Sequence, residues 1–354
     1  VGVGVWLLVA WGVADFSGTL AWTALAALAV TGLSVAVLRW RELAADARAA
    51  WPTWLALEIV FIAAFALFLA YRAWNPDLWH PFRGGEKPME LAYFTAIVRS
   101  TRMPPFDPWF AGGSMNYYYM GWFLVAVPIR ALRIVPEVAF NLAIPTYAAL
   151  TAVTAASTVH NLVALARRHR HPLSSAWTWR RPAIVAGVLG AVLLAGIGNL
   201  DGAHQAIERL QSVNSWSFLE GVPVLGGAVG LAGGVYEYVF LGTKLPAFDW
   251  WRSSRVHIGT FDITEFPYWT FLFADLHPHL MDMPVFGLTI ATGLGYVVAT
   301  VRRMHSRAWV LAGLLGLEAG LVRTVHTWDF PTAVLLVGVA VVLGQLLSRD
   351  RWDL

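Results

Sequence analysis

Long apolar stretches, each sufficient to cross a lipid bilayer, constrain the fold of this chain more than any other feature. A helix needs roughly 20 apolar residues to cross the ~30 Å of bilayer hydrocarbon. Seven stretches are candidates: residues 19 to 38, 52 to 73, 138 to 165, 183 to 200, 284 to 301, 308 to 325 and 331 to 348. Residues 1 to 14 resemble an eighth, truncated span. The sequence therefore predicts an all-α polytopic membrane protein with about eight transmembrane helices.

Composition agrees with a bilayer environment. Hydrophobic residues make up 58% of the chain, charged residues only 13%, and 19 residues are tryptophan, which is outside the usual range of soluble domains. Only two of the 25 basic residues are lysines, Lys87 and Lys244. The arginines cluster between apolar stretches, so membrane topology explains them better than nucleic-acid binding does. We therefore expect no nucleic-acid partner.

The ends of the chain and its lack of cysteine set further limits. Without cysteine, the chain has neither a disulfide framework nor a thiolate metal site. It starts within one apolar stretch and stops just after another. We therefore expect residues 1 to 354 to form a single transmembrane domain that is a fragment of a longer protein. The sequence specifies no oligomeric state.

The arginine clusters predict the membrane topology, because basic residues favour the cytoplasmic side. The clusters are Arg39, Arg41 and Arg48; Arg167, Arg168 and Arg170 with Arg180 and Arg181; Arg302, Arg303 and Arg307; and Arg349 and Arg351. All of them lie inside only if the short apolar stretch at residues 119 to 133 does not cross, so we expect an interfacial or re-entrant helix there. Two structured loops then lie outside the cell membrane: residues 74 to 137, with juxtamembrane helices, and residues 201 to 283. The short turn at residues 326 to 330 lies on the same outer side.

The first external loop carries two candidate catalytic acids, Glu86 and Glu90. The apolar spacing of residues 89 to 99 predicts a short helix lying on the membrane, and a spacing of four puts both carboxylates on one face of a helix. Two such carboxylates can hold a divalent ion or divide the roles of acid and base. Alternatively, they are ordinary charges at a helix start, where the helix dipole favours them.

The second external loop contains the densest polar cluster, Asp275, His277 and His279, followed by Asp282. In an extended segment, a His-x-His pattern puts both imidazoles on one side. Neutral imidazoles with carboxylates suit zinc or another transition metal, and the alternative is a hydrogen-bonded loop packed by its proline. A loop so rich in ligand-type side chains is poorly explained as a solvated connector. We therefore expect it to face the same cavity as Glu90.

Several aromatic and charged side chains are candidates for substrate binding. A guanidinium fork matches phosphate oxygens, although a plain surface role explains loop arginines equally well. Tyrosines at a membrane boundary either stack on a sugar or anchor the interface, and an arginine at the outer interface binds a lipid phosphate or merely snorkels. The candidates are Tyr117, Tyr118, Tyr119, Arg252, Arg255, Arg323, Trp328 and Asp329.

Four segments carry a resemblance to a known family. They read EKPMELAYF, PPFDPWFAGGSMNYYY, EFPYWTFLFADLHPH and HTWDFP. These segments resemble the uncharacterised YYY family of large bacterial and archaeal integral membrane proteins, named for its tyrosine triplet, and the resemblance covers the chain from about Trp74 to Pro331. That family is in turn similar, more distantly, to the GT-C glycosyltransferases, which take a sugar from a polyprenyl-phosphate carrier on the outer side of the membrane.

The resemblance implies a GT-C-like fold and a set of catalytic acids. The first-loop acid of the GT-C enzymes corresponds to Glu90 or Glu86, and a second-loop acid corresponds best to Asp201. On this basis we expect Glu90 and Asp201 to share one catalytic centre. We expect a transferase whose donor is a sugar linked to polyprenyl phosphate and whose other partner is membrane lipid. Its cofactor would be a divalent metal, Mg²⁺ or Mn²⁺.

Two other functional classes fit the same sequence. The first is a metal-dependent hydrolase of envelope lipid or glycan, with zinc bound by Asp275, His277 and His279. The second is a non-catalytic transporter or assembly protein, in which Glu318 and Arg323 are the working groups, because ionisable residues within a membrane span are usually functional or paired.

Overall fold

The computed structural model describes residues 1–80, 85–170, 176–198, 200–219, 221–256 and 264–349. Two compact units make up the chain. The larger unit comprises Val1–Ala195 and Phe271–Leu354, and the smaller unit comprises Gly196–Thr270. The second predicted loop, residues 201 to 283, is therefore divided, since its last part, which carries the His-x-His pattern, belongs to the larger unit.

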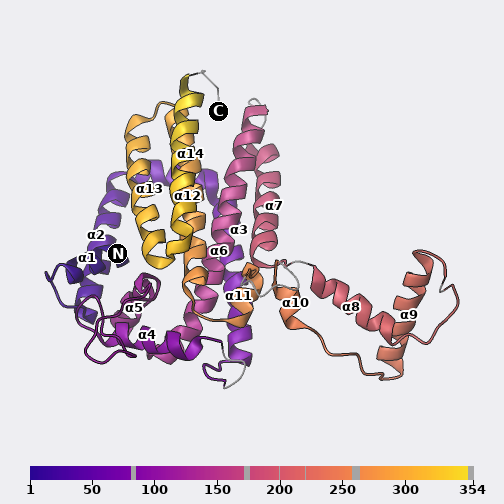
Figure 1. The fold of residues 1–354 in the computed structure, drawn as a ribbon. Helices are drawn as coiled ribbons and strands as arrows, with labels where there is room; N and C mark the ends of the chain where they lie inside the picture. Colours follow the sequence, from indigo (N-terminus) through magenta and orange to yellow (C-terminus); the bar gives the residue numbers. More distant parts are fainter. Residues whose placement is uncertain (81–84, 171–175, 199, 220, 257–263, 350–354) are drawn as a thin grey trace. The chain divides into compact units, whose positions relative to one another are not determined.

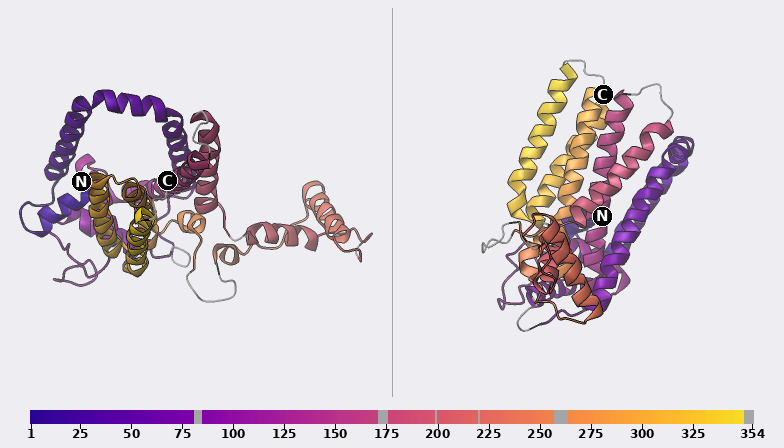
Figure 2. Two further views of the ribbon diagram at one scale, coloured as in Figure 1. Left: turned by 90° about the horizontal axis from the view of Figure 1, so that it is seen from above. Right: turned by 90° about the vertical axis from the view of Figure 1, so that its right-hand side faces the viewer.

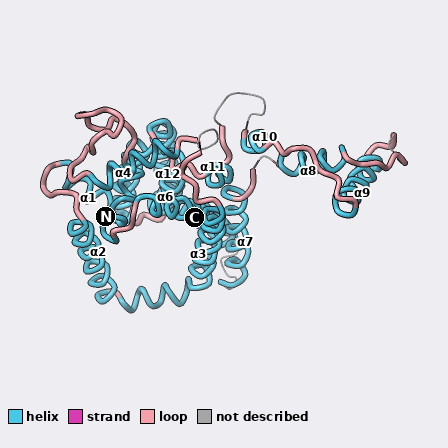
Figure 3. The backbone as a smooth tube through the Cα atoms, turned by 90° about the horizontal axis from the view of Figure 1, so that it is seen from below, coloured by secondary structure: helices cyan, strands magenta, loops and turns pink. Residues whose placement is uncertain are grey.

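The larger unit is a bundle of helices (Figure 1). Its helices are α1 (Gly2–Ala10), α2 (Gly18–Leu38), α3 (Trp40–Trp74), α4 (Lys87–Arg99), α5 (Met120–Leu132), α6 (Pro136–Arg170), α7 (Ala176–Ala195), α12 (Pro278–Val301), α13 (His305–Val325) and α14 (Phe330–Arg349), with the short 3-10 helix η1 (Thr327–Asp329) before α14. The described part of the chain contains helices and loops and no strand (Figure 3). The predicted all-α polytopic architecture is confirmed.

Six described helices are long and apolar enough to cross a membrane. They are α2, α3, α6, α12, α13, and the segment formed by η1 and α14. The predicted span at residues 183 to 200 corresponds to α7, which ends at Ala195 and is not among these six. The predicted truncated span at residues 1 to 14 contains the nine-residue helix α1, which is shorter than the roughly 20 residues that a span needs.

Helices α6 and α12 form the centre of the larger unit. Helix α6 packs against α3, α7 and α12, while α12 also packs against α13 and α14. Figure 2 shows α12, α13 and α14 side by side. Small residues such as Ala152 and Ala156 on α6 and Ala191 on α7 are buried where these helices meet, because small side chains allow helix backbones to approach closely in a membrane protein.

The short helices gather at one end of this bundle. Helices α4 and α5, the start of α12 and the α13–α14 turn lie there (Figure 1). The opposite end contains the α2–α3 junction, the end of α6 and the α12–α13 junction. These elements carry the first three of the four arginine clusters. This separation is the one that the arginine pattern requires. The side of the membrane that each end faces stays a prediction, and Arg351 lies outside the described residues.

The smaller unit contains α8 (Asp201–Ser212), α9 (Leu225–Phe240), α10 (Trp250–Ser254) and the start of α11 (Pro267–Phe273). Helices α8 and α9 pack together. Their approach requires Gly234, since a Cβ atom at this position would lie 1.8 Å from the carbonyl oxygen of Leu210. The glycine-rich helix α9 therefore packs closely against α8.

Candidate functional site

Helix α4 positions the two predicted acids at the loop end of the bundle. Glu86 is the N-cap residue of α4, and Pro88 occupies the first turn, where its missing N–H costs nothing. One turn later, Glu90 lies on the buried face with Phe94 and Ile97. The predicted helix at residues 89 to 99 is confirmed and begins two residues earlier. Glu86 is therefore exposed at the start of α4, whereas Glu90, four residues later, is buried against the bundle.

The loop before α12 is fixed to α4 by its polar groups. The Glu86 backbone N–H donates to Asp275 Oδ2 at 3.1 Å, and Lys87 Nζ lies 3.0 Å from Asp275 Oδ1 in a buried ion pair. Gly85 has a φ of +63°, and a Cβ atom there would lie 2.3 Å from Asp275 Oδ2, so only glycine fits this turn. On the other side, Trp122 Nε1 donates to the Leu276 carbonyl at 2.8 Å.

The two histidines flank the start of α12 instead of lying in a continuous extended segment. Pro278 is the first residue of α12, and His277 is its N-cap, because the fixed φ of proline suits the first helical position. The imidazoles still contact each other, with 2.9 Å between His277 Nδ1 and His279 Nδ1. At this distance one nitrogen must carry the proton and the other must accept it.

The first metal-ligand group consists of Glu86, Glu90 and His277. One ligand atom from each residue lies within 4.8 Å of the others, and His277 Nε2 is 2.8 Å from Glu86 Oε2. The segment expected to face the same cavity as Glu90 thus brings His277 close to Glu90, and the shared cavity stays a prediction. Two carboxylates and one imidazole are ligands that divalent cations accept.

Glu90 is the most unusual group in this cluster. Its side chain is fully buried, at 0% exposure, and neither carboxylate oxygen has a hydrogen-bond partner among the described residues. Burial raises the pKa of Glu90 well above its ordinary value, and the charges of Asp275 and Glu86 raise it further, while the charge of Lys87 offsets part of the shift. Without a cation, the structure favours the neutral carboxyl form.

Burial also shifts the two neighbouring titratable groups of the loop. It raises the pKa of Asp275, although the charge of Lys87 and the Glu86 amide oppose the shift. It lowers the pKa of His277, and the nearby His279 lowers it further, while Glu86 opposes the change. His277 is therefore neutral near pH 7, which is the form that binds a metal or accepts a proton.

A second group joins α12 to the α13–α14 turn. Asp282, His326 and Asp329 each offer a ligand atom within 4.8 Å of the others. The His326 ring lies edge-on to the His279 ring, with 6.3 Å between the centroids. Sequence reasoning named Asp329 as a substrate-binding candidate and noted Asp282, but did not connect them and passed over His326. The signal was the HTWDFP segment, whose partner on α12 is distant in sequence.

The three predicted tyrosines have different surroundings. Tyr117 stacks on Tyr93, at 5.5 Å between ring centroids, and on Trp122, at 5.8 Å. Burial, with the charges of nearby acids, raises the pKa of Tyr117 to about 12. Tyr118 lies edge-on to the His326 ring at 6.4 Å. By contrast, the Tyr119 hydroxyl accepts a hydrogen bond of 3.0 Å from the indole N–H of Trp6 on α1.

The larger unit also contains an apolar groove. It has a volume of about 500 Å³ and is bounded by α5, α6 and α12. Its lining includes Leu124, Pro128, Leu142, Tyr147, Pro284 and Leu288. Because Pro284 follows Asp282 by two residues on α12, the groove and the second group share that helix.

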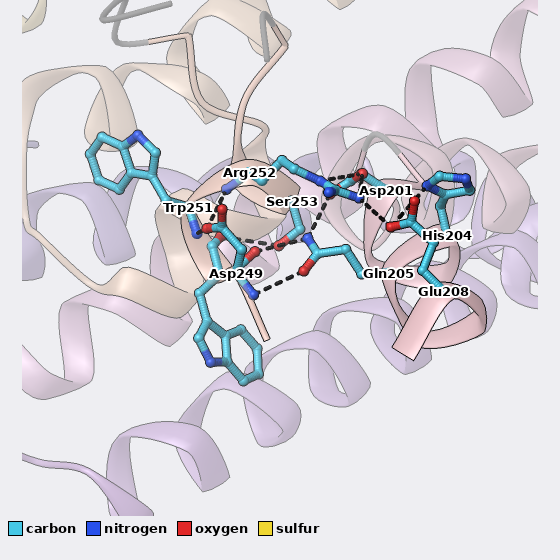
Figure 4. Close-up of polar contacts among 9 residues, drawn as sticks. Asp201, His204, Gln205, Glu208, Asp249, Trp251, Arg252 and Ser253 are labelled. Atoms are coloured by element: carbon cyan, nitrogen blue, oxygen red, sulfur yellow. Dashed lines mark hydrogen bonds and ion pairs between the residues drawn. The ribbon is translucent and has the colours of Figure 1, made fainter. Parts of the chain in front are cut away.

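The predicted second-loop residues form a network of their own within the smaller unit. Arg252 binds Asp201, with Nη2 2.7 Å from Oδ1, and also binds Glu208 at 3.0 Å. Gln205 Nε2 donates to Asp201 Oδ2 at 2.6 Å, as Figure 4 shows. The hydrogen bonds from Arg252 lower the pKa of Asp201 below its ordinary value. The geometry favours a structural ion pair, because a low pKa makes a weak base.

Arg255 is also engaged inside the smaller unit. Its Nη1 lies 3.1 Å from Glu265 Oε1, its guanidinium stacks 3.6 Å from the Trp251 ring centre, and its side chain is buried. A buried guanidinium that already holds a carboxylate is poorly placed to bind phosphate, so these contacts favour a structural role. Its predicted role in substrate binding stays a prediction.

The remaining predicted residues lie on α13 and in the following turn. Arg323 is exposed, with its guanidinium 5.2 Å from the Phe330 ring centre, and Trp328 is 78% exposed. Glu318 accepts a hydrogen bond of 2.8 Å from Thr292 on α12. The intramembrane acid is therefore partnered by a hydroxyl of a neighbouring helix.

Two predicted groups of residues stay predictions. Glu90 belongs to the larger unit and Asp201 to the smaller one, so their shared catalytic centre stays a prediction. For the predicted zinc set, Asp275 pairs with Lys87, whereas His277 groups with Glu86 and Glu90. Zinc binding by Asp275, His277 and His279 also stays a prediction.

Comparison with known proteins identifies the family. The chain belongs to the family described as "Uncharacterized membrane protein (DUF2298)", whose model matches residues 1–352. No curated protein and no solved structure matches the chain. Membership of an uncharacterised family of membrane proteins is confirmed, and these comparisons do not show the more distant similarity to GT-C glycosyltransferases.

Proposed function

We propose that this member of the DUF2298 family is a membrane glycosyltransferase that takes a sugar from a polyprenyl-phosphate carrier. The observation that carries the proposal is the buried carboxylate of Glu90, which accepts no hydrogen bond from a donor group of the described residues and lies with Glu86 and His277 in one group. A buried carboxyl group without a partner is costly and is typical of a working site. The resemblance of the EKPMELAYF segment to the first-loop acid of the GT-C enzymes supports the same assignment.

The two acids have different accessibility, which suggests different roles. The Glu86 side chain is 56% exposed and is therefore the carboxylate that an acceptor can reach. Glu86 takes the proton of the acceptor hydroxyl while the acceptor oxygen bonds to the sugar C1 and the bond from C1 to the phosphate oxygen breaks. The electron pair leaves with the polyprenyl phosphate, and the configuration at C1 inverts. His277, hydrogen-bonded to Glu86, holds the base in position.

A divalent cation, Mg²⁺ or Mn²⁺, fits the same group. Glu90 and His277 would hold it, while Glu86 acts as the base, because the Glu90 oxygens accept no hydrogen bond from a donor group of the described residues. Such a cation would neutralise negative charge on the leaving phosphate. It would also keep Glu90 ionised despite its burial.

The apolar groove supports a lipid-linked donor. Its volume of about 500 Å³ and its apolar lining on α5, α6 and α12 match the needs of an isoprenoid chain, which binds by burying hydrocarbon. The site of the polar head would then be the loop end of the bundle, where α4 and the start of α12 meet. Tyr117 lies there, in a stack of aromatic rings that favours contact with a sugar face.

The test is transfer from a panel of polyprenyl-phosphate hexoses by the purified full chain in detergent. Glu86→Gln and Glu90→Gln should each reduce the rate by about 10² or more, because loss of a base or of phosphate neutralisation commonly costs that much. Glu137→Gln is the matched control, since this exposed acid opens α6. Unchanged rates in both site variants would refute the proposal.

Metal content separates this proposal from the hydrolase alternative. Zinc that copurifies and resists dialysis, and that disappears in His279→Gln, would favour hydrolysis at Asp275, His277 and His279. Exchangeable Mg²⁺ or Mn²⁺ would favour the transferase. The hydrolase alternative is supported by His277, whose imidazole belongs to the first metal-ligand group. The hydrogen bond between Thr292 and Glu318 gives the transporter alternative less support, because it satisfies the intramembrane acid internally.

A further inference from the structure

A second carboxylate and histidine group lies outside the proposed catalytic site. Asp282 is on the second turn of α12, His326 is the C-cap residue of α13, and Asp329 is the last residue of η1. His326 is extended, with φ −148° and ψ 96°, and its carbonyl accepts the N–H of Asp329 at 3.1 Å. The tight turn thus presents His326 and Asp329 together toward α12.

Asp282 gives the independent sign that this group binds a ligand. Its side chain is fully buried, at 0% exposure, and neither carboxylate oxygen accepts a hydrogen bond from a donor group of the described residues. Its polar neighbour is the carboxyl group of Asp329, with which it can share a hydrogen bond only if one of the two acids is protonated. Two carboxylates in such contact require either a proton or a cation between them. The Asp282 carboxylate lies within 4.8 Å of ligand atoms on His326 and Asp329, so its oxygens face the group.

The spacing of the ligand atoms suits one bound ion. His326 Nδ1 and Asp329 Oδ2 are 2.8 Å apart, close to the roughly 3 Å that separates neighbouring ligands at bond lengths of about 2.1 Å. An ion pair between His326 and Asp329 alone would leave Asp282 without compensation. A doubly charged cation among the three residues would instead balance both carboxylates.

We propose that Asp282, His326 and Asp329 bind a divalent transition-metal ion, which ties the start of α12 to the α13–α14 turn. The imidazole ligand favours Mn²⁺, Zn²⁺ or a similar ion over Mg²⁺ and Ca²⁺, which prefer oxygen ligands. The rings of His279 and Tyr118 lie against His326 and hold it in position. None of the three ligands belongs to the proposed catalytic group, so this site stands independently of the proposed activity.

The experiment counts bound ions with the catalytic group disabled. The full chain carrying Glu90→Gln and His277→Gln is purified in detergent, stripped with EDTA and titrated separately with Mn²⁺ and Zn²⁺. Calorimetry and the electron paramagnetic resonance of free Mn²⁺ give the stoichiometry. One ion per chain should bind, and it should raise the melting temperature. Adding Asp282→Asn or His326→Gln should abolish both effects, and adding Glu137→Gln should change neither.

Folding is checked without metal, so that loss of the site is separated from loss of the protein. Asp282→Asn should melt at or above the temperature of its parent in EDTA, because it replaces a buried carboxyl group that faces another acid with a neutral amide that can donate to Asp329. If that variant fails to fold, His326→Gln decides the outcome by the same titration. Binding of an ion that survives in a folded Asp282→Asn or His326→Gln variant would overturn the proposal, as would the absence of any binding in the parent. Neither result depends on transferase activity.

Discussion

At the residue scale, the loop end of the bundle contains two buried carboxyl groups, Glu90 and Asp282, that accept no hydrogen bond from a donor group of the described residues. Each faces one histidine and one further acid. Ordinary packing does not account for such groups, because a buried acid without a hydrogen bond destabilises the fold. Their surroundings therefore favour ligand binding, and the histidines between them, His277, His279 and His326, form a continuous run of contacts.

The raised pKa of Glu90 predicts how stability depends on pH. A carboxyl group with a pKa that is higher in the folded protein stabilises the fold fully below its unfolded pKa and loses that contribution as the pH rises through the folded pKa. In EDTA, the melting temperature of the wild-type chain should therefore fall relative to that of Glu90→Gln as the pH rises above the ordinary value of 4.5. Scanning calorimetry in detergent across pH 4 to 9 measures the difference. A difference that stays constant with pH would contradict the assignment, and Glu137→Gln should show none.

At the scale of elements, close helix contacts depend on where glycine and proline lie. Pro278 starts α12 between the two histidines, and Pro88 lies in the first turn of α4 beside the two acids. Both ligand-bearing segments thus sit at helix starts. In the smaller unit, α9 can approach α8 because Gly234 has no side chain.

Substitution at Gly234 should destabilise the α8–α9 pair. In Gly234→Ala, the new methyl group meets the backbone oxygen of Leu210 at 1.8 Å, so α9 must move, at a cost of about 1–3 kcal/mol. Limited proteolysis should then cut residues 196–270 faster than in the wild type. Gly227→Ala on the same helix has only an ordinary contact of 3.7 Å and should be neutral or stabilising by up to ~1 kcal/mol. Equal cleavage rates in the two variants would argue against this packing.

At the scale of the whole molecule, the two ends of the helix bundle carry different polar residues. The elements bearing the arginine clusters meet at one end, and both ligand groups meet at the other. A bilayer-spanning protein with this arrangement places the two ligand groups on one side of the membrane and the arginine clusters on the other. The side with the arginine clusters is expected to face the cytoplasm.

Cysteine labelling tests this orientation, since the chain has no native cysteine. Single cysteines at Ser114 and Ser253 should react with an impermeant maleimide added to intact cells. A cysteine at Ser175, which lies outside the described residues, should react only after permeabilisation, because the adjacent arginine cluster favours the cytoplasmic side. Labelling of Ser175 in intact cells would contradict the topology.

The sequence by itself determined the membrane class, the spans at α2, α3, α6, α12, α13 and α14, and the helix at α4, because long apolar stretches and local spacing depend on neighbouring residues alone. Spacing also placed Glu86 and Glu90 on one helix. It could not reveal that one is exposed and the other buried, since burial depends on what packs against α4.

Only the tertiary structure decided which distant residues meet. It brought Glu86 to His277 across 191 positions of sequence, paired Lys87 with Asp275, and joined Asp282 to His326 and Asp329. It also gave Asp201 a partner, Arg252, whose hydrogen bonds lower the pKa of Asp201, while the catalytic role of Asp201 stays a prediction. These contacts depend on helix packing and on loops that join residues far apart in the sequence, and no local periodicity predicts such contacts. The two ligand groups therefore form only where α4, α12 and the α13–α14 turn pack together.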